Sequence, residues 1–172
     1  MSDEREPHQD AAAADTLHFE HLVQINDPRE LRIEPIRRDQ LWRGLLLRAQ
    51  TPQLFIPWLD EVEVESDADG SLRRVLHFGD YEVRDQVHFE NETRVRYEIE
   101  DERANTHFSL TMCIEEPAND ALFVRFTYAA RSIDHHAQSP LGEMVKSAYQ
   151  QADRDTVFRI RQLAASGVLE KQ

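Results

Sequence analysis

Between Glu61 and Arg131 the chain alternates apolar and polar residues in one short run after another. It then changes to a helical period from Pro140 to Ala165. Alternation with a period of two indicates strands with one buried and one wet face, and short turns between runs favour an antiparallel meander. A long amphipathic helix must bury its apolar stripe against such a sheet. This order predicts a curved sheet that grips one helix, with a cavity between them.

The predicted fold class is therefore α+β, with about seven strands, two short helices after the first strand and one long C-terminal helix. The first short helix spans Leu41 to Ala49, and the second starts at Thr51-Pro52 and stops near Pro57-Trp58. Threonine before proline is typical of a helix start. The long helix is predicted to be capped by Ser139 and followed by Gly167 as the residue just past its end. Its predicted apolar stripe consists of Leu141, Met144, Val145, Ala148, Ala152, Thr156, Ile160, Leu163 and Ala164. The predicted strands are His18–Ile25, Val62–Glu65, Leu72–Phe78, Tyr81–Phe89, Val95–Ile99, Phe108–Ile114 and Leu122–Tyr128.

The composition fits one soluble domain. The chain has 172 residues, 40% of them apolar, and a net charge of −13. Such a charge repels phosphate backbones, and with no basic stripe we expect no nucleic-acid partner. No apolar run approaches the ~20 residues that cross a bilayer, so we expect no membrane insertion. Residues 1–16 are acidic and alanine-rich and are predicted to be a disordered tail, and residues 17–167 a single domain. A single cysteine, Cys113, fits a cytoplasmic location.

These segments together resemble the SRPBCC (START-like, helix-grip) superfamily over roughly Leu17 to Ala165. More narrowly, the chain resembles the AtaL-like bacterial family of unknown function. The stretches that carry this likeness are Phe19-Glu20-His21 through Asn26-Asp27-Pro28, Leu41-Trp42-Arg43-Gly44-Leu45, Phe78 through Asp85, Leu110-Thr111-Met112 and Ile114-Glu115-Glu116-Pro117. The resemblance implies a helix-grip fold with a central cavity. It brings no established catalytic residues.

Two titratable residues stand on apolar strand faces. Asp85 shares a face with Tyr81, Val83 and Val87, where a carboxylate is partly desolvated and has a raised pKa unless a cation pairs with it. It is interpreted either as a ligand-orienting group or acid/base, or as the structural partner of an arginine or a tyrosine hydroxyl, or as a residue that a bulge turns outward. His21 stands likewise on the first strand, as a pocket residue or a hydrogen-bonded core histidine. Because the first strand should neighbour the last, His21 and Asp85 need not meet.

Aromatic residues complete the candidate pocket. Tyrosines offer a flat apolar body with one polar tip, which suits either a ligand pocket or ordinary core packing. The candidates for the mouth of the pocket are Phe55, Trp58 and Met144, because the short helices are expected to meet the start of the long one there. The pocket candidates are His21, Phe55, Trp58, Asp85, Tyr97, Tyr128, Met144 and Tyr149.

Sequence motifs for other chemistry are missing. Asp134-His135-His136 has no spaced third ligand, so it is interpreted as a solvated loop and no metal is expected. Cys113 has no histidine and asparagine partners in a recognisable pattern, and no Gly-x-Ser-x-Gly or glycine-rich phosphate loop occurs. No cofactor is predicted, and no catalytic residue is assigned.

The leading hypothesis is a protein that binds a small hydrophobic or amphipathic ligand in an internal cavity. One alternative is an enzyme of the cyclase, dehydratase or hydrolase type, which some SRPBCC relatives are, with one acid/base in the cavity. Another is an interaction or regulatory module, which predicts a sizeable exposed apolar patch. The sequence leaves the ligand and the oligomeric state open.

Overall fold

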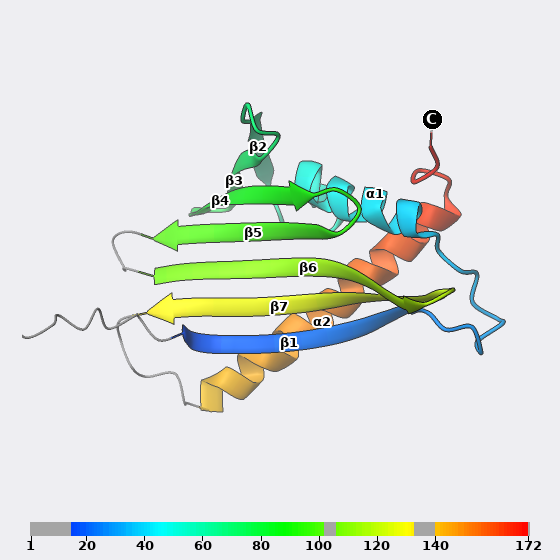
Figure 1. Ribbon diagram of the computed structural model, residues 1–172. Helices are drawn as coiled ribbons and strands as arrows, with labels where there is room; N and C mark the ends of the chain where they lie inside the picture. Colours follow the sequence, from blue (N-terminus) through cyan, green and yellow to red (C-terminus); the bar gives the residue numbers. More distant parts are fainter. Residues whose placement is uncertain (1–14, 102–105, 133–139, 172) are drawn as a thin grey trace, which may run out of the picture.

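A computed structural model describes residues 15–101, 106–132 and 140–171 of the chain (Figure 1). The elements in chain order are β1 (Asp15–Asn26), α1 (Arg38–Gln50), the 3-10 helix η1 (Pro52–Leu54), β2 (Glu61–Ser66), β3 (Leu72–Phe78), β4 (Tyr81–Glu90), β5 (Arg94–Asp101), β6 (Thr106–Ala118), β7 (Ala121–Ser132) and α2 (Pro140–Ala165). The predicted order of elements and the predicted fold class are confirmed. The predicted tail falls mostly outside the described residues, although Asp15 and Thr16 belong to β1. The proposed helix cap Ser139 and the Asp134-His135-His136 segment also lie outside them.

The sheet has seven antiparallel strands in the order β1-β7-β6-β5-β4-β3-β2. The first strand pairs with the last, as expected, but the sheet ends in two edges, β1 and β2. Successive strands from β2 onwards are neighbours, so turns connect most of them. Figure 1 shows α2 crossing one face of this curved sheet diagonally, with α1 at one end.

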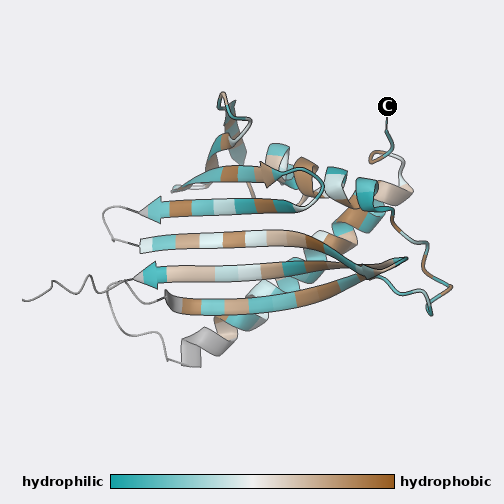
Figure 2. Ribbon diagram, viewed as in Figure 1, coloured by the Kyte–Doolittle hydropathy of each residue, from teal (hydrophilic) through white to brown (hydrophobic). Residues whose placement is uncertain are grey.

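Strand register places one side-chain row across six strands on the face that meets α2. Tyr97 of β5 is opposite Leu110 of β6, and Leu110 is opposite Tyr128 of β7. Because successive side chains point to opposite faces, the flanking residues along each strand face the other way. Figure 2 shows the resulting alternation of apolar and polar residues along the strands. The full row is Leu72, Val87, Tyr97, Leu110, Tyr128 and Phe19.

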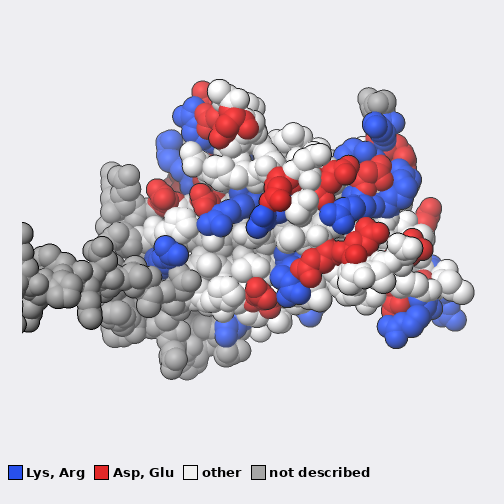
Figure 3. Space-filling view, in the orientation of Figure 1, with Lys and Arg blue, Asp and Glu red and all other residues white. Residues whose placement is uncertain are grey.

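The sheet face seen in Figure 3 carries interspersed positive and negative side chains. Arg125 contacts Glu115 at 2.6 Å, and Arg96 contacts Glu98 at 2.6 Å. These side chains are half-exposed, and exposed ion pairs contribute about 0–1 kcal/mol each. Their arrangement agrees with the predicted solvated face and shows no basic stripe among the described residues.

In the first half of α2, the face that packs on the sheet differs from the predicted one. Ala148, Ala152 and Met144 were assigned to the apolar stripe, yet all three are exposed. Tyr149 and Asp153 turn toward the sheet instead, and Thr156, Val157, Ile160 and Leu163 continue this buried face. Alanine packs on either face at little cost, so its spacing misled the pattern, whereas the aromatic ring of Tyr149 gains from contact with the sheet.

Helix α2 ends at Ala165, and Gly167 takes the predicted position just past its end with a φ of 83°. The amide of Val168 donates to the Leu163 carbonyl, and that of Gly167 to the Ala164 carbonyl, which together form a Schellman cap. The chain then turns back, so that Leu169, only 2% exposed, joins the core.

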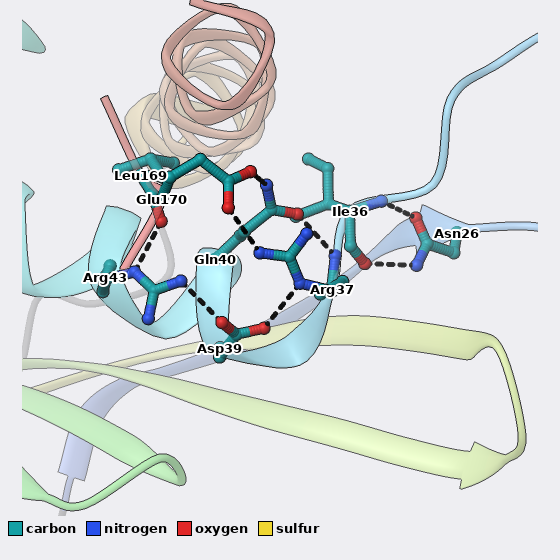
Figure 4. A network of polar contacts seen from close by, with 8 residues as sticks. All are labelled: Asn26, Ile36, Arg37, Asp39, Gln40, Arg43, Leu169 and Glu170. Atoms are coloured by element: carbon teal, nitrogen blue, oxygen red, sulfur yellow. Dashed lines mark hydrogen bonds and ion pairs between the residues drawn. The ribbon is translucent and has the colours of Figure 1, made fainter. Parts of the chain in front are cut away.

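A polar network ties this C-terminal turn to the start of α1 and the end of β1 (Figure 4). Glu170 accepts hydrogen bonds from Gln40 at 2.8 Å and Arg37 at 2.9 Å. The Asn26 side chain makes two hydrogen bonds with the Ile36 backbone, at 2.6 and 2.9 Å. Three segments distant in sequence are thereby held at one end of the sheet.

The sequence predicted that the short helices meet the start of the long helix. In the structure they do not. The Arg159 guanidinium donates to the Leu54 carbonyl at 2.7 Å, which places η1 beside the second half of α2. Helix α1 also packs there, because Gly44 faces Ile160. The diagonal path of α2 across the sheet brings its C-terminal half, not its start, to the end where α1 lies.

The contact between the helices predicts the effect of Gly44→Ala. A methyl group at this position would lie 2.8 Å from Cγ2 and 3.0 Å from Cγ1 of Ile160. Alanine is normally preferred over glycine in a helix by about 1 kcal/mol. We nevertheless expect a net loss of about 1–3 kcal/mol in the free energy of unfolding, because the interior is overpacked. Urea unfolding measures it, and the loss should be smaller when Gly44→Ala is introduced into Ile160→Ala, which lacks both γ carbons. A stabilised Gly44→Ala protein would contradict this packing.

Candidate functional site

Asp153 of α2 lies at the centre of a buried polar group between the helix and the sheet. Its side chain is 2% exposed. The Tyr128 hydroxyl, from β7, donates to one carboxylate oxygen, and Nδ1 of His21, from β1, lies 3.2 Å from the other. The sequence brings the three together because His21 and Tyr128 occupy inward positions on neighbouring strands, and Asp153 lies on the sheet-facing side of α2.

Burial governs the protonation of this group. It raises the pKa of the Asp153 carboxyl, against the opposing effect of the hydrogen bonds from Tyr128 and His21. Burial also raises the pKa of Tyr128, and its hydrogen bond to the Asp153 carboxylate acts in the same direction. The tyrosine therefore stays protonated and serves as a donor, whereas the raised pKa of Asp153 makes its carboxyl easier to protonate than an exposed one.

A wall of aromatic rings adjoins the carboxylate. The rings of Tyr128 and Tyr149 are stacked with centroids 4.1 Å apart and planes within 5° of each other. Phe108 lies 6.1 Å from Tyr149, and Phe19 lies 6.1 Å from Tyr128. Tyr149, Phe19 and Phe108 are only partly buried. Flat apolar surface thus remains beside a few polar groups, which is the composition of a small-molecule site.

Arg48 and Tyr97 extend the polar group toward α1. Arg48 lies in the last turn of α1, and its guanidinium carbon is 5.0 Å from the centre of the Tyr97 ring. Nε of Arg48 and the hydroxyl of Tyr97 are both buried without a hydrogen-bond partner. The charge of Arg48 lowers the pKa values of both Asp153 and Tyr128, so it belongs to the same electrostatic environment. We call His21, Arg48, Tyr97, Tyr128 and Asp153 the interior polar cluster.

Asp85 instead belongs to a buried ion pair. Its two carboxylate oxygens accept from Nε and Nη2 of Arg74 at 2.8 and 2.5 Å, and Nη1 of Arg74 donates to the Ala49 carbonyl at 2.9 Å. This is the arginine-partner alternative of the sequence reading. The pair connects β3 and β4 to the C-terminal end of α1. Breaking one partner of such a pair typically costs about 3–5 kcal/mol, so its geometry is that of a structural tie.

Only some of the predicted pocket residues lie together in the structure. His21, Tyr128 and Tyr149 come together, and Tyr97 occupies the same sheet row as Tyr128. Phe55 packs partly buried at the edge of the core. Trp58 and Met144 are 71% and 72% exposed and do not contact the interior group.

Three clefts are described, all near the surface. One of about 330 Å³ lies between residues 33–37 and the end of α2, and another of about 330 Å³ lies beside the end of β1. A third, of about 480 Å³, lies along β2, β3 and β4. Among the described residues that line these three clefts, Asp85 is the only one of the eight pocket candidates. The interior polar cluster is therefore identified by its unsatisfied and titratable groups and not by an open volume.

The sequence reading missed Asp153 and Arg48. Both carry a signal that spacing reveals. Asp153 follows Tyr149 by four residues on the helix, and Arg48 follows Gly44 by four on α1, so each shares the inward face of its helix. Charged residues on an apolar helix face are informative because they are seldom buried without a partner.

The fold defines the class of protein first. Solved structures that match include the Zhui aromatase/cyclase from Streptomyces sp. R1128, at 15% identity and a TM-score of 0.60, over 88% of this chain and 95% of that one. Truncated norcoclaurine synthase from Thalictrum flavum matches at 12% identity and a TM-score of 0.62, over 91% and 95%. The same synthase in complex with dopamine and hydroxybenzaldehyde matches at 11% identity and a TM-score of 0.61, over 91% and 89%. These likenesses establish a helix-grip fold of the Bet v1/SRPBCC type.

The family follows from the sequence. The chain belongs to the AtaL family, described as acetylaranotin biosynthesis cluster protein L, whose model matches residues 20–167. No curated protein matches it. None of the described helices has the length and apolar character needed to cross a membrane.

The raised pKa of Asp153 predicts a pH-dependent effect of Asp153→Asn. The folded protein binds this proton more tightly than the unfolded chain, whose carboxyl has a pKa near 3.8. The contribution of Asp153 to wild-type stability should consequently fall as the pH rises from about 4 towards neutrality. Asparagine does not ionise and keeps an oxygen for the Tyr128 hydroxyl. We expect the unfolding free energy of Asp153→Asn to gain on that of the wild type over this range. Denaturant unfolding across pH measures it, and a difference independent of pH would contradict it.

Proposed function

We propose that this protein binds a small amphipathic metabolite between α2 and the sheet, with the interior polar cluster fixing its orientation. The observation that carries the proposal is Asp153, a buried carboxylate shared by Tyr128 and His21 and placed beside stacked aromatic rings. A flat apolar wall with a few convergent polar groups suits such a ligand.

Stability alone gives no reason to keep this carboxylate. Burial disfavours its charged form, and each unit of raised pKa corresponds to about 1.4 kcal/mol lost when the group ionises. Groups whose pKa is altered by burial concentrate at functional sites. Apolar residues at positions 21, 128 and 153 together would fill the same space without that penalty, so a role in ligand binding accounts for this polar group better than packing does.

The solved structures with this fold support a small-molecule role. They include an aromatase/cyclase and a synthase determined with dopamine and hydroxybenzaldehyde. Those ligands and activities belong to the proteins named. For this chain they favour a ligand with an aromatic part, in agreement with the Tyr128–Tyr149 stack. A cytoplasmic setting is part of the proposal and is supported by the single cysteine, Cys113, which cannot form a disulfide within the chain.

Native mass spectrometry tests the proposal. The protein would be measured as purified and after incubation with naphthols, flavonoids and hydroxybenzaldehydes. We expect one added small molecule per chain that leaves on denaturation. Asp153→Asn should retain the ligand about tenfold less well than the wild type, or worse, since a charge-assisted hydrogen bond is lost. Asp155→Asn is the matched control, because Asp155 lies on the exposed side of the same helix. Equal retention by both variants would count against the proposed site.

A second candidate function is catalysis at the same place. The altered proton affinity of Asp153 and the imidazole of His21 beside it suit a general acid/base. Once a reacting substrate is known, Asp153→Asn separates the two functions. An enzyme loses turnover while affinity is largely retained, whereas a binding protein changes in affinity alone.

A further inference from the structure

We propose that Arg48 and Tyr97 form an anion-accepting subsite, so that the ligand carries an acidic oxygen, such as a carboxylate or an ionised phenol or enol, attached to its aromatic part. This inference rests on the proposed binding function and specifies the chemistry of its ligand.

Arg48 is a cation that no carboxylate among the described residues contacts directly. A guanidinium stays charged in proteins and has five N–H donors to satisfy. Nε of Arg48 is buried without a partner, and its side chain makes no ion pair or hydrogen bond with any residue in the described part of the chain. Arg48 as a whole is half-buried, but a buried N–H donor such as its Nε is costly unless an acceptor reaches it.

Arg74 supplies the internal comparison. Its guanidinium carbon also lies 5.0 Å from the centre of the Tyr97 ring. All three of its guanidinium nitrogens donate to protein groups, two of them to Asp85 and the third to the Ala49 carbonyl. Two arginines thus lie over one ring, and only Arg74 is neutralised by a neighbouring carboxylate. The excess positive charge is at Arg48.

Tyr97 gives the second, independent observation. It is 5% exposed, and its hydroxyl is buried with no hydrogen-bond partner. Buried polar atoms in native proteins are nearly always hydrogen-bonded, so such an atom needs an explanation. A hydroxyl that donates to the same ligand oxygen as Arg48 supplies one, because both groups are donors that are left over in one place.

The surroundings select an aromatic acid. Tyr128 occupies the same sheet row as Tyr97, with Leu110 between them, so the stacked Tyr128–Tyr149 rings lie along the row from the unpartnered hydroxyl. A flat ring placed against this wall brings an attached oxygen toward Arg48. The arginine charge, which also acts on Asp153, offsets the repulsion between that carboxylate and a bound anion.

The test compares two probes of nearly equal shape, 2-naphthoate and its neutral amide, naphthalene-2-carboxamide. Isothermal titration calorimetry at neutral pH would measure both on the wild type and on Arg48→Met. We expect the wild type to bind the carboxylate about tenfold or more tightly than the amide, as for a charge-assisted hydrogen bond. Arg48→Met should abolish this preference and keep the affinity for the amide.

Arg38→Met is the matched control. It removes the same charge from the same helix, but Arg38 donates to the Glu92 carbonyl at the surface. The control should retain the wild-type preference. If both probes bind and the preference is absent from the wild type, or persists in Arg48→Met, the anion subsite is overturned while the proposed binding function stands. If neither probe binds the wild type, the result counts against the binding site itself.

Arg48→Gln covers the case in which Arg48→Met loses both probes through misfolding. Glutamine keeps a polar side chain with N–H donors and removes the charge. A reduced or abolished carboxylate preference in this variant supports the subsite, and an undiminished preference overturns it.

Discussion

Side-chain alternation along seven antiparallel strands is the constraint on which the rest of this structure depends. It commits every second residue to the face that α2 covers and leaves the others to the charged outer face. Tyr97 and Tyr128 enter the interior by this parity, in one row with Leu110 between them. The helices then supply what the sheet lacks, since Asp153 comes from α2 and Arg48 from α1. The interior polar cluster is thus assembled from separate elements that only the complete fold brings together.

The cluster differs from the other buried polar group in the way its members are satisfied. Arg74 and Asp85 complete each other and the end of α1, so the fold alone accounts for them. The interior polar cluster keeps two unpartnered donors and a carboxylate whose proton affinity is altered by burial. Sites that act on ligands commonly carry groups that stability alone does not favour. We interpret the ion pair of Arg74 and Asp85 as a group that stabilises the fold, and the interior polar cluster as a group that binds a ligand.

The sequence was sufficient for the fold because its signals are local and periodic. Alternation predicted the seven strands, and Gly167 predicted the end of α2. It was insufficient where packing decides between near-equivalent faces. Ala148 and Ala152 fit either side of a helix, so the stripe was drawn through them and Asp153 was overlooked. The partner of Asp85 was also hidden, because Arg74 lies on another strand, and only strand register places the two side by side. Trp58 shows the converse: an aromatic residue in a predicted mouth proves to be exposed.

The central claim is that the unpartnered donors serve a ligand and not the fold. Tyr97→Phe tests it most directly, because it removes one hydroxyl and leaves every hydrogen bond among the described residues intact. The free energy of unfolding would be measured for both proteins, without ligand and with saturating 2-naphthoate. The account predicts that the unliganded variant is as stable as the wild type or more stable, since a buried unsatisfied group is removed, and that it gains less stability from the ligand. A variant that is destabilised without ligand and stabilised by it as much as the wild type would contradict the account.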